Sequence, residues 1–386
     1  MKPLSIWTYY WNNKRKVVPI VGIIALAILA ISSTGTLTGS LFDDAKRQVA
    51  FFERFASVFP TQPYGLSDGR IEELEGRPEV ARVYRGEGRS TRIQGIFGSQ
   101  GARMNFLAPE DQHDFAERLG WRLTAGRWPA PETNEVAVTE NVLKNRTLKV
   151  GDKIGRLADP NDFLIGEWVI VGALTDGVTS GGVGDLSRFR AQYMVGLGMP
   201  PEVAVHPNVV WLQPAQGQEA ALERYLDTLP TTEVGVNYAT KVRRNVDNEL
   251  ENVNTIIWIL NAISIVVLTL ALGLLNIIFF MQRGNEFGLL AAIGYTKGFL
   301  MRRTFLESAV TVVVGWTLGI LLAQVVYSVV NAVFFVPSGL SPLTVLTPRV
   351  LLFTVPVPVT VTLFSLAVVT YLLVKLDPVA IIERRD

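Results

Sequence analysis

Residues 283–303 read RGNEFGLLAAIGYTKGFLMRR and separate two long uncharged stretches of the chain. The stretch before this segment runs from Asn254 to Met281, and the stretch after it runs from Ala309 to Val336. Each is long enough to cross a bilayer as a helix. A compact basic segment between two such spans is typical of a cytoplasmic loop. We therefore expect it to be a surface that a cytosolic partner can push on.

The segment between the two spans has a helical pattern of its own. Phe287, Leu290 and Ile293 recur at helical spacing, which predicts a short amphipathic helix. Gly294 fits the stop of that helix, and Thr296 fits the N-cap of the next one. The pattern predicts a short helix, a turn and then a helix that leads into the following span.

The composition favours a membrane protein with a soluble portion. Of the 386 residues, 49% are apolar and 18% are charged, whereas ordinary soluble domains carry about 25% charged residues. The chain has no cysteine, which excludes disulfides, thiol nucleophiles and cysteine-based metal sites. Its two histidines, His113 and His206, are expected to be ordinary surface residues. No metal site and no catalytic residue are predicted.

Four uncharged apolar runs each reach the roughly 20 residues that a transmembrane helix needs. They are Val17–Leu41, Asn254–Met281, Ala309–Val336 and Val350–Val374. A signal peptide is the alternative for the first run, but its length and the three later runs favour a retained anchor. The predicted organisation is an interfacial helix at 1–16, spans at 17–41, 254–282, 305–336 and 350–374, an outer segment at 42–253 that ends in a stalk at 240–253, a coupling segment at 283–304, a short outer loop at 337–349 and a tail at 375–386.

The charged residues predict which parts lie on which side of the membrane. The N-terminal segment, the coupling segment with Glu307 and the tail together carry 11 basic and 5 acidic residues. Residues 42–253 carry 24 basic and 30 acidic residues. Because basic loops stay in the cytoplasm, both termini and the coupling segment are expected there, and residues 42–253 outside. The near-neutral total of +1 gives no indication of nucleic-acid binding.

The outer segment is predicted to mix helices and strands. Helical patterns cover Asp43–Phe59, Ile71–Leu74 and Gln218–Leu229. Strand-like runs cover Val80–Tyr84, Arg92–Phe97, Glu135–Val138, Trp168–Gly172 and Asn208–Leu212. Residues 179–185 read TSGGVGD and lack the Gly-Lys-Ser/Thr ending of a phosphate-binding loop, so a flexible glycine-rich loop is expected.

Span 2 and the polar residues before it are predicted to form one helix. Residues 240–253 contain no glycine or proline, which favours a stalk that continues the span beyond the membrane. Within the span, polar and small residues share one broad sector: Asn261, Ser264, Thr269, Gly273 and Asn276. Such residues usually mark helix–helix contact, and a substrate path is the alternative. Contact is favoured because the four uncharged runs contain no ionisable residue.

Several strings share one family pattern. At 285–297 the string NEFGLLAAIGYTK matches the motif Arg/Glu-Ile-Gly-Leu-Leu-Arg-Ala-Leu-Gly-Ala, and Phe305, Glu307, Gly315 and Gly319 follow it. The tail string LDPVAII at 376–382 is similar to the family's closing Asp-Pro-Val/Ala-Glu-Ala-Leu-Arg. GRWP at 126–129, NEVAV at 134–138, LKVGDKI at 148–154 and VIVG at 169–172 follow in the order of a MacB-like periplasmic core. The chain thus resembles FtsX-like permeases of MacB type, which are type VII ABC systems that work by mechanotransmission. It departs from the motif at Phe287, Ala291 and Tyr295.

The resemblance implies a membrane protein of four transmembrane helices with an α+β extracytoplasmic domain, in the bacterial inner membrane. It implies that coupling to the ATPase runs through Glu286, Phe287, Gly288, Leu289, Leu290, Ala292 and Gly294. The implied partners are a cytosolic ABC ATPase dimer, a second permease copy or paralogue, a periplasmic adaptor and membrane lipids. The chain has no Walker A sequence, so ATP and magnesium are expected on the ATPase and no enzymatic activity on this chain.

The expected function is export or extraction of a peptide, drug, lipid or lipoprotein, driven by the ATPase. The alternative is FtsX-like signalling to an outer partner such as a cell-wall hydrolase, without transport. The size of the outer segment favours the first. A sensor or scaffold without an ATPase is a further class. A membrane enzyme would have to use Asp111, His113 and Asp114, whose proximity in sequence is better explained by chance.

Overall fold

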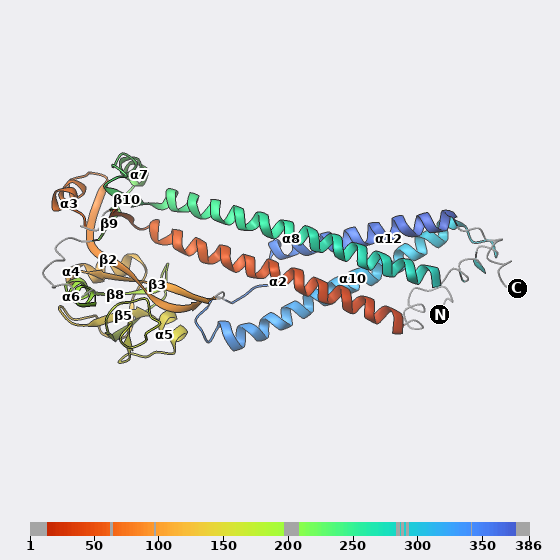
Figure 1. The fold of residues 1–386 in the computed structure, drawn as a ribbon, viewed down its shortest axis with the longest axis horizontal. Helices are drawn as coiled ribbons and strands as arrows, with labels where there is room; N and C mark the ends of the chain where they lie inside the picture. Colours follow the sequence, from red (N-terminus) through yellow and green to blue (C-terminus); the bar gives the residue numbers. More distant parts are fainter. Residues whose placement is uncertain are drawn as a thin grey trace. The chain divides into compact units, whose positions relative to one another are not determined.

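The structure is a computed structural model that describes residues 14–61, 65–95, 98–196, 208–282, 286, 289–290, 293–340 and 342–375 (Figure 1). The chain divides into two compact units. Unit 1 comprises Met1–Leu41, Glu251–Asn331 and Leu343–Asp386, and unit 2 comprises Phe42–Leu250 and Ala332–Pro342.

Long apolar helices build unit 1. They are α2 (Lys14–Phe52), α8 (Ala239–Gln282), α10 (Lys297–Val330) with a π-helical turn (Asn331–Phe335), α11 (Pro348–Thr354) and α12 (Pro356–Lys375). Within the described residues, four stretches are long and apolar enough to cross a membrane: Val17–Phe52, Ala239–Leu275, Lys297–Phe335 and Pro348–Tyr371. Each of the four predicted spans overlaps one of these stretches.

The core of unit 1 is apolar and draws on every long helix. Ile24 and Ile28 of α2, Leu272 of α8, Val312 of α10 and Val361 of α12 are buried in one cluster. The predicted fourth span is not one continuous helix, because α11 ends at Thr354 and α12 begins at Pro356. Proline has no N–H to donate to the preceding turn, so the helical hydrogen-bond ladder is interrupted there.

Unit 2 is built on a ten-stranded mixed sheet. Its strands are β1 (Ala56–Pro60), β2 (Val80–Gly95), β3 (Gly98–Leu107), β4 (Leu123–Gly126), β5 (Glu135–Thr139), β6 (Lys153–Ile154), β7 (Trp168–Leu174), β8 (Gly181–Asp185), β9 (Val209–Pro214) and β10 (Val234–Asn237). Its helices are α3 (Asp68–Glu75), α4 (Pro109–Arg118), α5 (Glu140–Arg146), α6 (Leu186–Gly196) and α7 (Glu219–Asp227). The strand order is β10-β1-β9-β2-β3-β8-β5-β7-β4, with β6 paired to β7.

One end of this sheet is a split βαβ arrangement. Two strand–helix–strand units, β1-α3-β2 and β9-α7-β10, build this end. Their four strands interleave in the order β10-β1-β9-β2, and each strand is antiparallel to its neighbours. This is the ferredoxin-like topology. Helices α3 and α7 cover it through a core that includes Val58, Ile71 and Leu226, and Figure 1 shows both helices beside this end of the sheet. The chain from β3 to α6 is inserted between β2 and β9.

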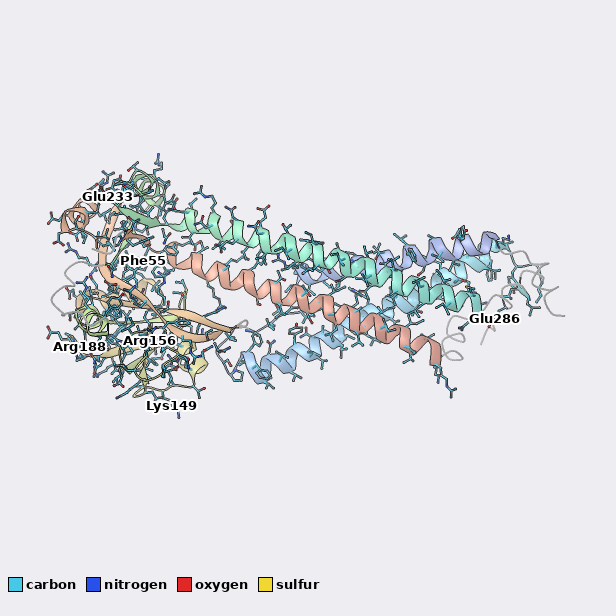
Figure 2. The ribbon with its side chains drawn as sticks, in the orientation of Figure 1. Phe55, Lys149, Arg156, Arg188, Glu233 and Glu286 are labelled. Atoms are coloured by element: carbon cyan, nitrogen blue, oxygen red, sulfur yellow. The ribbon has the colours of Figure 1, made fainter. Side chains whose placement is uncertain are left out.

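An aromatic cluster lies in the middle of unit 2. Phe55 and Phe115 stack with ring centroids 4.5 Å apart, and Tyr84 meets both rings edge-on. Phe55 is fully buried (Figure 2). Aromatic side chains bury large apolar areas and stabilise cores in these offset geometries. This cluster connects the residues just after α2 to the inserted part of the sheet.

Three predictions for unit 2 are wrong. The helix predicted over Asp43–Phe59 ends at Phe52, because residues 56–60 pair with both β9 and β10 as β1. The strand predicted at Arg92–Phe97 is not separate, since residues 92–95 continue β2 and residues 96–97 lie outside the described residues.

The third error is the flexible loop predicted at 179–185, where Gly181–Asp185 form the buried strand β8 between β3 and β5. A Cβ atom on Gly181 would lie 2.0 Å from the carbonyl oxygen of Arg103, and one on Gly182 would lie 2.6 Å from that of Ala137. The glycines therefore serve close approach of neighbouring strands rather than flexibility.

Candidate functional site

The coupling segment at 283–304 is described in part. Glu286, Leu289 and Leu290 are helical, and Glu286 lies beyond the end of α8 (Figure 2). Three of the residues predicted to couple to an ATPase, Phe287, Gly288 and Ala292, lie outside the described residues. The predicted site can therefore be followed at Glu286, Leu289, Leu290 and Gly294.

The short helix ends where the sequence predicted. Gly294 has a φ of +101°, and the Tyr295 N–H donates to the Leu290 carbonyl at 3.1 Å. A left-handed glycine followed by such a six-to-one hydrogen bond is a Schellman motif. This stop is a local backbone property, and it gives the turn a defined direction.

The next helix begins at once. The Thr296 side chain is the N-cap of α10 and accepts a hydrogen bond from Phe299 N at 3.3 Å. The predictions for Gly294 and Thr296 are both confirmed. A cap of this type stabilises a helix by about 1 kcal/mol, so the short helix and α10 are joined by a turn with two defined ends.

Apolar side chains are exposed along this turn. Leu289 and Ile293 are 64% and 67% exposed, and Phe299 is 44% exposed. The Tyr295 and Phe299 rings stack with centroids 5.1 Å apart. Exposed apolar side chains grouped on a short, capped segment are typical of a surface that a partner or a membrane interface covers. We call Leu289, Ile293, Tyr295 and Phe299 the coupling surface.

An ion pair lies in the first turns of α10. Arg303 Nε donates to Glu307 Oε1 at 3.1 Å, and both side chains are largely buried. The charge count placed Glu307 with the loop, whereas the structure places it at 4% exposure inside α10. The signal that identifies this pair is the i, i+4 spacing of opposite charges. Pairing offsets the cost of burying the carboxylate.

The predicted contact residues of span 2 have different surroundings. Asn261 is buried, and its Nδ2 donates to the Phe353 carbonyl of α11 at 3.4 Å. A Cβ atom on Gly273 would lie 2.1 Å from the Phe364 ring of α12. Ser264 instead donates to the Leu260 carbonyl of its own helix at 2.8 Å. The side chain of Asn276 lies outside the described residues.

Two further glycines of the bundle were not predicted as contact residues. Cβ atoms on Gly315 and Gly319 would lie 2.7 Å and 2.6 Å from atoms of Ile24 and Ile28 on α2. The spacing Gly-x-x-x-Gly at 315–319 is a known signal for close packing of membrane helices. The sequence contained this signal, although these glycines were used only for the family resemblance.

The residues considered for an enzyme form ion pairs instead of a catalytic group. The Asp111 carboxylate accepts a hydrogen bond from the Arg82 guanidinium at 2.6 Å. The Asp114 carboxylate accepts hydrogen bonds from the guanidinium groups of Arg82 at 3.1 Å and of Arg118 at 3.0 Å. The His113 ring packs on the Trp128 ring, with the ring centroids 5.2 Å apart. Both carboxylates of this cluster are therefore engaged in ion pairs with arginine side chains. In the described part of the chain, no group of His, Asp or Glu could hold a metal ion.

Comparison with known proteins matches part of the chain to a family. Residues 258–378 match the model described as FtsX-like permease C-terminal. This range holds most of span 2, spans 3 and 4 and the whole coupling segment. No curated protein sequence matches the chain.

Three solved structures are similar in fold at low identity. The periplasmic region of MacB from Actinobacillus actinomycetemcomitans is 10% identical over 52% of this chain and 95% of its own, with a TM-score of 0.30. The extracellular domain of the transporter YknZ from Gram-positive bacteria is 11% identical over 47% and 99%, with a TM-score of 0.28. A permease domain from Porphyromonas gingivalis is 14% identical over 48% and 88%, with a TM-score of 0.26. Similarity at this level carries no information on substrates or partners.

Proposed function

We propose that this chain is the membrane subunit of an ATP-binding-cassette system, because residues 258–378 match the model described as FtsX-like permease C-terminal. A separate cytosolic ATPase supplies the energy, and the chain carries no ATP or magnesium of its own. The observation that carries the proposal is the coupling surface, an exposed apolar group on a capped turn inside the family's own domain.

The proposed coupling works by direct mechanical contact. The ATPase binds Leu289, Ile293, Tyr295 and Phe299, with Glu286 next to them on the short helix. A turn with a Schellman stop on one side and an N-cap on the other resists deformation, so a push on it moves the helices it joins. This is why a partner would bind here rather than on a flexible loop.

Helix continuity supports transmission of that motion. The helix α8 runs without a break from Ala239 to Gln282, and α2 runs from Lys14 to Phe52. Each therefore contributes residues to both compact units. An α-helix rises 1.5 Å per residue with all of its internal hydrogen bonds made, so it transmits displacement along its axis.

The finer assignments are proposals of the same kind. We place the protein in the bacterial inner membrane with both termini in the cytoplasm, because its basic residues outside unit 2 cluster in the three segments predicted there. The assembly contains an ATPase dimer and a second permease copy or paralogue, with a periplasmic adaptor as a further partner. The work done is export or extraction of a peptide, drug, lipid or lipoprotein.

The test replaces apolar side chains of the coupling surface with a charge. In the proposed complex the ATPase buries most of the exposed Leu289 and Ile293 side chains. Leu289→Asp and Ile293→Asp should therefore each weaken association of the full-length chain with its ATPase by about tenfold or more. Association is measured by titrating purified ATPase onto the chain in lipid nanodiscs, and coupling by ATP hydrolysis of the complex. Leu157→Asp is the matched control, because Leu157 is 77% exposed in unit 2. Unchanged association in both coupling variants would contradict the proposal.

A further inference from the structure

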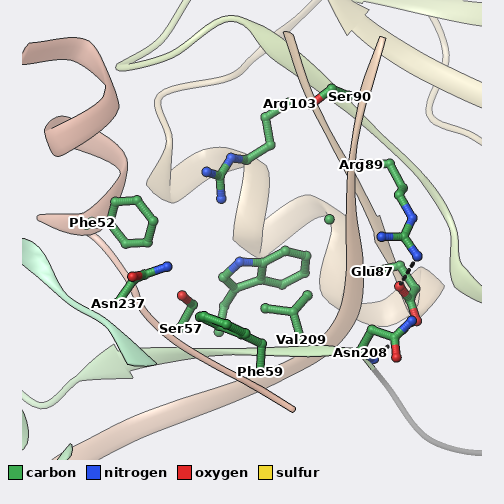
Figure 3. Close-up of a pocket in the computed structure, with 12 residues that line it drawn as sticks. Phe52, Ser57, Phe59, Glu87, Arg89, Ser90, Arg103, Asn208, Val209 and Asn237 are labelled. Carbon is green, nitrogen blue, oxygen red and sulfur yellow. Dashed lines mark hydrogen bonds and ion pairs between the residues drawn. The ribbon is translucent and has the colours of Figure 1, made fainter. Parts of the chain in front are cut away.

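A cavity of about 280 Å³ lies within unit 2 (Figure 3). Phe52 is the last residue of α2, Phe59 comes from β1, and Val209 and Trp211 come from β9. Arg103 of β3 and the pair Glu87 and Arg89 of β2 supply its charges. The cavity thus combines an apolar patch with a larger set of polar and charged groups, so a ligand that fits it must be polar in part.

The Arg103 side chain is the unusual member of this set. Within the described residues it has no carboxylate partner and no hydrogen-bond acceptor, and its Cζ lies 4.2 Å from the centroid of the Phe51 ring. Burial lowers the pKa of Arg103 to about 10, which leaves the side chain protonated at neutral pH. Figure 3 shows the guanidinium pointing into the cavity, on the side of Phe52.

The orientation of Arg103 leaves its donors available. A guanidinium over an aromatic face is held by cation–π attraction, and this contact uses none of its five N–H donors. Buried polar groups in native structures almost always have partners. A cation that is fixed in place with unused donors is therefore a feature that needs a ligand to explain it.

A second donor lines the same cavity without a partner. Trp211 is 1% exposed, and within the described residues its indole Nε1 has no hydrogen-bond partner. An unpaired buried donor costs about 1–3 kcal/mol. Arg103 and Trp211 belong to β3 and β9, which flank β2 on opposite sides, so both donors face one space from two strands.

The charges around the cavity indicate the charge of the ligand. Arg89 NH2 lies 3.5 Å from a Glu87 carboxylate oxygen, and Glu87 also accepts from Asn208 N at 3.1 Å. Among the residues that line the cavity, this pair is neutral as a unit, which leaves the single positive charge of Arg103. One unpaired guanidinium matches one negative charge, and the nearby Glu87 carboxylate opposes a dianion.

We propose that this cavity binds a carboxylate carried on an aromatic or aliphatic body, with Arg103 as the anchor. The carboxylate accepts hydrogen bonds from the Arg103 guanidinium, and the apolar body lies against Phe52, Phe59 and Val209. The volume admits a group of about the size of one amino acid, either as a whole ligand or as the end of a longer one. The site is independent of the ATPase coupling proposed above, and its test needs no ATPase.

The experiment measures binding to the full-length chain in lipid nanodiscs by isothermal titration calorimetry. The probes are N-acetyl-phenylalanine, its neutral amide, and inorganic phosphate. We expect the carboxylate to bind, and the amide to bind at least tenfold more weakly because the charge-assisted hydrogen bonds are lost. Phosphate should also bind more weakly than the carboxylate, because it has no apolar body.

Variants then locate the site. Arg103→Gln should weaken binding of N-acetyl-phenylalanine by about tenfold or more, and Arg103→Lys by less, since lysine keeps the charge without the planar fork. Asn237→Phe fills the cavity while Arg103 stays in place, and it should also abolish binding. Arg122→Gln is the matched control, because Arg122 is exposed and does not line the cavity.

Three outcomes would overturn the proposal. The first is no binding of N-acetyl-phenylalanine up to about 10 mM, where even a weak site is half-filled. The second is equal binding of the carboxylate and the amide, or tighter binding of phosphate. The third is unchanged binding in a folded Arg103→Gln or Asn237→Phe variant, with folding checked by the thermal midpoint of each variant.

Discussion

Asp162 connects segments of unit 2 that are far apart in sequence, among them β2 and α5. Its side chain is 1% exposed and accepts hydrogen bonds from the backbone N–H groups of Arg92, Gly155 and Leu164 at 3.0 Å, 3.1 Å and 3.1 Å. It also pairs with the Arg146 guanidinium. A buried carboxylate with this many donors is satisfied, so this site is structural and no ligand is needed to explain it.

Asp162→Asn should destabilise unit 2. Burial alone raises the pKa of Asp162, but the donors from Arg92, Leu164 and Arg146 outweigh it and the pKa lies below its ordinary value. The stability that Asp162 contributes is therefore fully present above the unfolded pKa of about 3.9 and is lost as pH falls through the folded pKa. At neutral pH we expect a loss of about 2 kcal/mol, since the amide gives up the charge-assisted hydrogen bonds that the carboxylate accepts, while Arg146 keeps its ion pair with Asp159.

Thermal unfolding of the full chain from about pH 3 to pH 7, followed by near-UV circular dichroism, measures this effect. Near neutral pH the Asp162→Asn variant should be less stable than the parent chain. On acidification its stability should fall by less than that of the parent chain. Asp247→Asn is the control, because Asp247 is exposed on α8. An equal acid dependence in the parent chain and in Asp162→Asn would show that Asp162 does not carry it.

At the scale of elements, close helix packing defines unit 1. Residues Gly315 and Gly319 let α10 approach α2, and Gly273 lets α8 approach α12. The hydroxyl oxygens of Thr269 and Thr360 lie 2.9 Å apart across the same α8–α12 contact. In lipid there is no hydrophobic force between helices, so such close contacts and hydrogen bonds decide which faces meet.

Gly319→Leu should separate α2 from α10. Even a Cβ atom at this position would lie 2.8 Å from the backbone oxygen of Ala25, which cannot rotate away. We expect a marked drop in the thermal midpoint of the bundle and loss of cysteine cross-linking between residues introduced on α2 and α10. The same replacement at Gly22, where nothing lies within 4 Å of a Cβ atom, is the control. If both leucine variants behaved alike, close packing at Gly319 would not be the cause.

At the scale of the whole molecule, the two compact units share helices. Both α2 and α8 pass from one unit into the other without a break. Residues 332–342 also belong to unit 2, where Asn145 Nδ2 donates to the Ser338 carbonyl at 2.8 Å. The backbone therefore passes between the two units at four points, and two of these points lie inside the continuous helices α2 and α8.

Glu249→Pro should uncouple the two units. Proline within α8 removes a helical hydrogen bond and costs about 3 kcal/mol, so the helix bends at the position where a rigid rod is needed. We expect the ATPase of the complex to stay active, while ATP-dependent changes in amide hydrogen exchange within Phe42–Leu250 disappear. Glu249→Ala keeps the helix and should leave these changes intact. Persistence of the exchange changes in the proline variant would contradict transmission through α8.

Much of the membrane part could be predicted from sequence because its signals are local. Hydropathy over about 20 residues identifies a span whatever surrounds it. The stop at Gly294 and the cap at Thr296 depend on neighbours within one helical turn. The exposure of Leu289 and Ile293 beside this turn emerged only from the structure.

The fold of unit 2 depends on contacts between residues that are distant in the sequence. Less of this fold could therefore be predicted from the sequence alone. Residues 181–185 are a strand because β3 and β5, far away along the chain, lie on either side of them. Arg103 is an ordinary arginine in the sequence, and only the fold surrounds it with Phe51, Phe52 and Trp211. Local physical chemistry therefore determined the spans and caps. Tertiary structure alone decided the sheet and the cavity, because strand pairing and the desolvation of a charge depend on which remote residues come together.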